Sequence, residues 1–153
     1  MYSSLLSLHS LLRWLVLLSL VYAIFLGYRG WFGKKTFSRH DNFTRHTTAT
    51  IAQLQMVLGL WIYFISPLMD SFMHHYKEAV KQGEIRFFGM EHSVMMAIAV
   101  VLITIGSMKA KRKSTDPQKF KTMALWFTAA FIVILIMIPW PFSPLASRPW
   151  IRF

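Results

Sequence analysis

The chain contains four long apolar segments, each close to the length that crosses a bilayer as a helix. They lie at 5–27, 47–66, 88–108 and 122–142 of the 153 residues. About 20 apolar residues in a helix span the roughly 30 Å hydrocarbon core of a membrane. The sequence therefore predicts an all-α, integral membrane four-helix bundle that forms a single domain over residues 1–153.

The composition agrees with a membrane protein and restricts its chemistry. Apolar residues make up 55% of the chain and the mean hydropathy is +0.43, which is unusual for a water-soluble domain. The chain has no cysteine. Disulfides, iron–sulfur clusters, thiolate zinc sites and covalently attached c-type haem are therefore excluded, and any cofactor must be held by His, Met, carboxylates or packing.

The basic residues between the apolar segments predict an orientation. Segments 28–46 and 109–121 carry eleven Lys and Arg together, whereas 67–87 carries three and the tail adds Arg148 and Arg152. The positive-inside rule then places 28–46 and 109–121 in the cytoplasm, and 67–87 and both termini on the outer, periplasmic side of a bacterial inner membrane. The net charge of +11 is explained by this cytoplasmic face, so we expect a lipid bilayer and not nucleic acid as its partner.

Local signals predict where the first two helices begin and end. Gly27, Gly30 and Gly33 are expected to end the first helix and open the basic loop. The second helix is expected to begin near Thr47 and to end at Ser66 before a proline.

The outer side is predicted to carry two surface segments. Residues 68–82 have helical spacing that places Leu68, Phe72 and Tyr76 on one face, which is typical of an amphipathic helix on the membrane surface. The proline-rich tail after Pro139 cannot continue a helix, and we expect it along the outer interface.

Four ionisable residues lie inside the predicted spans, where such groups are costly and normally face the bundle interior. These are His9 and Arg13 in the first span, and Glu91 and His92 in the third. At a rise of about 1.5 Å per residue, His9 lies ~27 Å and His92 ~24 Å from the inner ends of their helices. The two imidazoles are therefore expected at one depth, near the outer face.

This arrangement favours a site for haem b. Two histidines at one depth on different helices can supply both axial nitrogens, with His9 and His92 as the metal ligands. Arg13, one turn below His9, would pair with a propionate, and Glu91 lies at the same level. Met96, four residues after His92, would allow His–Met ligation instead.

Two other interpretations of these residues stay open. In the first, Arg13 and Glu91 form a buried ion pair and the histidines only join the first helix to the third. In the second, Glu91, His92 and Arg13 serve a small transporter or proton-conducting unit, although four short helices leave little room for one.

The remaining polar residues carry weaker signals. Adjacent His74 and His75 point about 100° apart on a helix and rarely share a metal, while His46 is a weak candidate for an inner haem ligand and the role of His40 is open. Two glutamines of the second span are expected to form hydrogen bonds between helices, namely Gln53 and Gln55.

Several landmarks of the chain resemble a family of small bacterial four-helix inner-membrane proteins labelled cytochrome b or cytochrome b-like. The similar segments are LHSLLRW (8–14), QMVLGLWIYF (55–64), FFGMEH (87–92), VVLITIGSMKAKR (100–112) and IPWPF (138–142). The resemblance covers most of the chain and implies a four-helix bundle with haem at His9 and His92. Relatives often place a His before the glycine motif of the second helix, where this chain has Gln53.

The sequence thus predicts a haem b-binding electron-transfer protein of the inner membrane, exchanging electrons with a quinol pool or a periplasmic partner. The alternative is a non-catalytic accessory subunit of a larger membrane complex. No nucleophile–base pair, phosphate loop or paired carboxylates appear, so a stand-alone enzyme is not expected.

Overall fold

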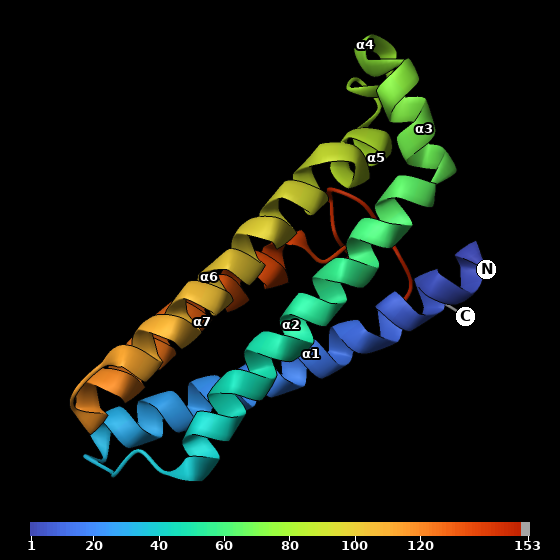
Figure 1. Ribbon diagram of the computed structural model, residues 1–153. Helices are drawn as coiled ribbons and strands as arrows, with labels where there is room; N and C mark the ends of the chain where they lie inside the picture. The colour runs from blue at the N-terminus through green and yellow to red at the C-terminus, as the bar shows by residue number, and fades with distance from the viewer. Residues whose placement is uncertain (151–153) are drawn as a thin grey trace.

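Four long helices form an antiparallel bundle in the computed structural model, which describes residues 1–150 (Figure 1). The long helices are α1 (Tyr2–Phe32), α2 (Arg39–Ile65), α6 (His92–Arg112) and α7 (Asp116–Met137). Between α2 and α6 lie α3 (Pro67–His74), α4 (Tyr76–Ala79), α5 (Gly83–Arg86) and the π-helix η1 (Phe87–Glu91). The described residues contain no strand, so the predicted all-α class is confirmed.

The four spans are long and apolar enough to cross a membrane, counting Gly83–Arg112 as one helical span. Large apolar side chains such as Leu18, Phe25, Val57 and Ile132 are exposed along them. A surface of this kind needs an apolar surrounding, and lipid supplies it. The chain is therefore a multi-pass membrane protein whose partner is the bilayer.

The helices pack in a ring in chain order. Helix α1 packs on α2, α2 on α6, α6 on α7, and α7 packs back on α1. The core consists of side chains from all four helices, with Leu20, Ala52, Ile103 and Phe127 almost fully buried. This order places α1 diagonally opposite α6, with the bundle interior between them.

The basic connections are shorter than predicted, because the helices continue past the apolar segments. Ser38 and Asp41 form a capping box that begins α2 eight residues before Thr47, so the expected start at Thr47 is wrong. Only 33–38 and 113–115 connect the helices at this end, and most of the basic residues lie on helix ends. Both connections lie at the same end of the bundle, opposite both ends of the described chain (Figure 1).

Gly27 and Gly30 do not end α1, contrary to expectation, and Gly33 does. A Cβ on Gly27 would lie 3.0 Å from the Cβ of Ala124, and one on Gly30 would lie 2.4 Å from the ring of Phe120. These two glycines therefore permit α1 to approach α7 closely, as small residues do between membrane helices.

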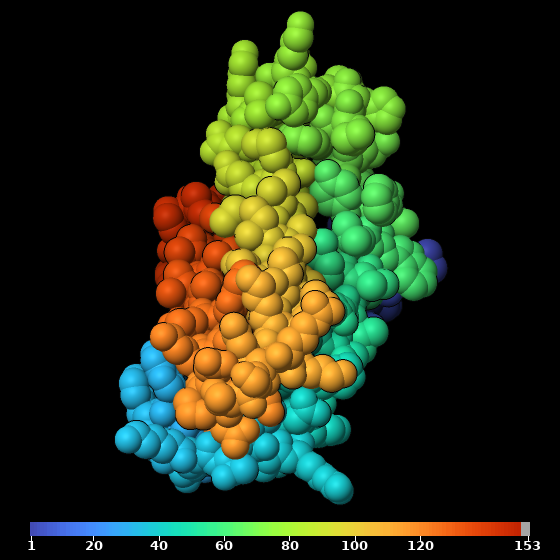
Figure 2. All heavy atoms as spheres, turned by 60° about the vertical axis from the view of Figure 1, so that its left-hand side comes forward, coloured from blue at the N-terminus to red at the C-terminus, as the bar shows by residue number. Residues whose placement is uncertain are grey.

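The predicted surface helix over 68–82 is broken into two short helices at His75. Phe72 is buried beside Met69 and Ala79. Its ring contacts that of the exposed Tyr76, with the ring centroids 5.3 Å apart. In Figure 2 this segment, coloured green, projects beyond the end of the membrane spans.

The tail after α7 does not continue the helix, as expected, and its place along the outer membrane interface stays a prediction. Helix α7 ends at Met137, and Ile138 and Ala146 are buried as the chain turns back toward α1 (Figure 1). The ring of Trp150 stacks on that of Trp14, with the ring centroids 6.2 Å apart, and the Trp150 carbonyl accepts a hydrogen bond from the Trp14 indole N–H. Arg152 lies outside the described residues.

A buried arginine joins α2 to α6 at the end with the basic connections. Arg45 is 4% exposed and donates to the carbonyl and hydroxyl of Ser107 and to Oδ1 of Asn42. Its planar guanidinium reaches all three acceptors, whereas the ammonium of lysine is a point charge that cannot form the same fork.

We expect Arg45→Lys to lower the free energy of unfolding by about 1–3 kcal/mol, because the buried acceptors of Ser107 lose their donor while the charge is kept. Thermal unfolding in detergent measures the effect, with the exposed Arg112→Lys as control. Equal unfolding temperatures for the two variants would show that the fork contributes nothing.

Candidate functional site

A cavity of about 240 Å³ opens inside the bundle at the end where the termini lie. It is more than ten times the roughly 10–15 Å³ that one water molecule needs, so it is large enough for an organic group. The tail closes one side of it with Arg148 and Pro149. Its polar and sulfur-bearing lining includes His9, Arg13, Gln55, His92 and Met96.

The two histidines reach the cavity from opposite sides of the bundle. His9 belongs to α1 and His92 to α6, which lie diagonally across the ring of helices. The predicted common depth of the two imidazoles therefore corresponds to a common cavity.

A π-helical turn directly before α6 sets the direction of His92. The backbone N–H of His92 donates to the carbonyl of Phe87, five residues earlier, and the turn thus holds one residue more than an α-helical turn. Tyr63 donates to the carbonyl of Gly89 within this turn, at 2.9 Å. Such single π turns often occur at functional sites.

The His92 ring is fixed through its Nδ1 atom, which lies 2.8 Å from the carbonyl oxygen of Met137. A carbonyl only accepts hydrogen bonds, so Nδ1 carries the proton and Nε2 is left with a lone pair. A backbone carbonyl on one ring nitrogen is the usual partner of a histidine that ligates metal through the other.

His9 is held through its backbone and by close packing. Gln55 Nε2 donates to the backbone carbonyl of His9 at 2.9 Å, which ties α2 to α1 at this level. A Cβ on Gly59 would lie 3.2 Å from His9 Cε1, so the glycine leaves room for the imidazole.

Three buried polar atoms at this cavity have no hydrogen-bond partner within residues 1–150. They are His9 Nδ1, Arg13 Nε and Gln55 Oε1. Arg13 uses another nitrogen, Nη2, to donate to the carbonyl of Trp150 at 2.5 Å. Leaving a buried donor or acceptor unpaired costs about 1–3 kcal/mol, so three on one cavity mark it as a place for a polar ligand.

Glu91 lies apart from the other predicted site residues. It accepts a hydrogen bond from Arg86 Nε at 2.7 Å and does not line the cavity. The suggested Arg13–Glu91 ion pair is therefore wrong, because each residue has a different partner. The wide π turn before His92 accounts for the separation, since it changes which residues of this helix face inward.

The other histidines do not join the site. His40 contacts the Tyr22 hydroxyl at 2.9 Å, and His74 contacts Asp70, both on the exposed surface. His46 and His75 are exposed. Within residues 1–150, no cluster of three or more His, Asp or Glu side chains could hold a metal ion.

Gln53 and Gln55 form the interhelical hydrogen bonds expected of them, to Thr104 Oγ1 and to the His9 carbonyl. Sequence reasoning did not assign Gln55 and Gly59 to the site, although their spacing of four residues places both on one face of α2. Arg148 carried no signal, because its position depends on how the tail turns back.

Comparison with known proteins finds no match: no family description, no curated protein and no solved structure is detectably similar to this chain.

Proposed function

We propose that the protein binds haem b and transfers electrons in a bacterial inner membrane, with His9 and His92 as the residues that would hold the iron. The observation that carries this proposal is one cavity with an imidazole from each of two diagonally opposite helices and three buried polar atoms that have no partner within residues 1–150. In four-helix bundles, cofactor sites are built from side chains of facing helices in this way.

The residues at the cavity fit such a group. His92 presents the unprotonated Nε2 that ligation requires, because Nδ1 is held by the Met137 carbonyl. His9 has the space beside Gly59 to keep its ring at the cavity. Met96 also lines the cavity, so His–Met ligation is the variant of the same proposal.

One arginine at the cavity is placed to hold a carboxylate. Arg13 Nε is buried and has no acceptor within residues 1–150, whereas Arg148, which also lines the cavity, is already paired with the carboxylate of Glu84. Guanidinium groups bind carboxylates through charge-assisted hydrogen bonds, so Arg13 would take a propionate. Haem in this position would supply one-electron chemistry, and its potential would depend on the side chains that hold the iron and on their hydrogen bonds.

The orientation that we propose brings the site near the periplasmic face. The basic residues at 28–46 and 109–121 favour a cytoplasmic location for the opposite end. A quinol at the outer leaflet or a periplasmic carrier would then be the redox partner. The proposed relation to cytochrome b-like proteins rests on the motif resemblance alone.

The test is a visible spectrum of the purified protein, reduced with dithionite minus oxidised in air, with a pyridine haemochrome assay. We expect a b-type α-band and about one haem per chain. A colourless protein from haem-replete cells would contradict the proposal. Copurification with fixed partners would then favour the accessory-subunit alternative.

A further inference from the structure

A second hollow lies at the opposite end of the bundle, between the ends of three helices. Its volume is about 290 Å³, and it is lined by Phe37, Ser38, Arg39, Asn42, Lys111 and Lys119. The three cations come from three segments: the start of α2, the end of α6 and the start of α7. Side chains distant in sequence thus meet at one basic hollow.

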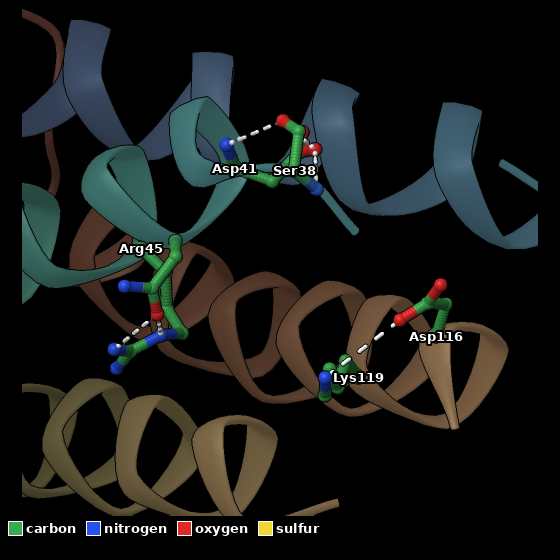
Figure 3. Close-up of polar contacts among 6 residues, drawn as sticks. Ser38, Asp41, Arg45, Asp116 and Lys119 are labelled. Atoms are coloured by element: carbon green, nitrogen blue, oxygen red, sulfur yellow. Dashed lines mark hydrogen bonds and ion pairs between the residues drawn. The ribbon is translucent and has the colours of Figure 1, made fainter. Parts of the chain in front are cut away.

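The wall formed by Phe37 and Lys119 is held in place by packing. Phe37 packs edge-on against the buried ring of Phe120, with centroids 4.9 Å apart. The Lys119 ammonium lies 5.6 Å from the centroid of Phe37 and 3.7 Å from Asp116 (Figure 3). Its charge is therefore positioned at the hollow before any ligand arrives.

Asn42 is fixed so that it offers donors and not acceptors. Its Oδ1 accepts from both Nε and Nη2 of the buried Arg45, at 3.2 and 2.9 Å. The amide nitrogen, which carries two N–H donors, has no acceptor within residues 1–150. Because Arg45 occupies Oδ1 of Asn42, only the amide N–H groups of Asn42 are available to a ligand. Arg45 also places a further positive charge next to Asn42.

The charge of the hollow is positive. Arg39 and Lys111 have no acidic partner in the described part of the chain. Asp41, the acid closest to Arg39 in sequence, is buried and accepts from the backbone N–H and hydroxyl of Ser38 (Figure 3). The lining therefore presents cations and neutral donors together, which is the chemistry that binds a phosphate oxyanion.

We propose that this hollow binds the phosphate of an anionic phospholipid headgroup. Arg39 binds it as a fork, and Lys111, Lys119 and the Asn42 amide complete the site. Phe43, the residue after Asn42 on α2, is exposed, so the apolar outer surface of this helix begins at the same level of the bundle as the hollow, as the acyl chains of a lipid require. Basic pockets between membrane helices bind anionic headgroups in this manner. The haem proposal and this site are independent of each other.

The experiment measures the thermal unfolding of the full chain in a neutral detergent during titration with phosphatidylglycerol, phosphatidylcholine or inorganic phosphate. The test variant is Arg39→Gln with Lys111→Gln. The matched control is Lys35→Gln with Lys113→Gln, which removes two exposed charges near the same connections but outside the hollow. Asn42→Ala tests the neutral donor without changing the charge.

We expect phosphatidylglycerol, and not phosphatidylcholine, to raise the unfolding temperature. The test variant should weaken this binding roughly tenfold, since each lost cation removes local attraction. The control should weaken phosphatidylglycerol binding less than about threefold, because the two charges that it removes are exposed and salt screens their attraction for the lipid. If inorganic phosphate stabilised the protein as much as phosphatidylglycerol does, the proposal that the bound phosphate belongs to a lipid headgroup would be wrong. Equal losses in both double variants would overturn the site.

Discussion

Replacing His92 by alanine is expected to remove the b-type spectrum that the haem proposal predicts, with at least about tenfold less haem retained per chain. The variant loses the proposed Nε2 ligand and also the hydrogen bond to the Met137 carbonyl that fixes the ring. His9→Ala should have the same effect from the opposite helix. Haem content by pyridine haemochrome, divided by protein, measures both.

The controls separate ligation from folding. His40 and His46 lie away from the cavity, so alanine there should leave the spectrum unchanged. Added imidazole should restore the spectrum of His92→Ala if the cavity is intact, because a free imidazole can take the place of the missing ring. An unchanged spectrum in both His9→Ala and His92→Ala would rule out the proposed ligands.

The second large effect is expected at Gly106, where α6 packs tightly against α7. A Cβ on Gly106 would lie 2.3 Å from the Cβ of Trp126. Both atoms are fixed to the backbone, so no rotamer change can relieve the overlap and the helices must move apart. We expect Gly106→Ala to lower the free energy of unfolding by about 1–3 kcal/mol, as overpacking does. Thermal unfolding in detergent measures it.

Gly83→Ala is the matched control, because a Cβ at Gly83 meets no atom within 4 Å. Its unfolding temperature should equal or exceed that of the unchanged chain, since alanine favours helix. If Gly106→Ala were as stable as Gly83→Ala, the close α6–α7 contact would not contribute to stability.

The number and class of the helices could be predicted from hydropathy, because a span needs about 20 apolar residues whatever its neighbours are. Their ends were less predictable. Helix α1 continues past Gly27 and Gly30. These glycines serve the close contact with Ala124 and Phe120 on α7, which leaves no space for a side chain on α1. Helix α2 begins earlier, because Ser38 and Asp41 form a local capping box that the apolar pattern does not reveal.

The candidate site could be predicted in part. Helical rise was enough to place His9 and His92 at one depth, because it depends only on residue count. The partners of Arg13 and Glu91 were not predictable, because they depend on the tail and on the π turn: Arg13 meets the Trp150 carbonyl and Glu91 meets Arg86.

The sequence by itself determined a multi-pass helical membrane protein with two histidines at one level, because span length and helical rise are local properties of the chain. Only the tertiary structure decided that α1 lies diagonally opposite α6 and that both imidazoles line one cavity. It also decided that Arg39, Lys111 and Lys119 meet at one hollow. Such contacts join residues far apart in sequence, and they depend on how helices pack, which no local pattern encodes.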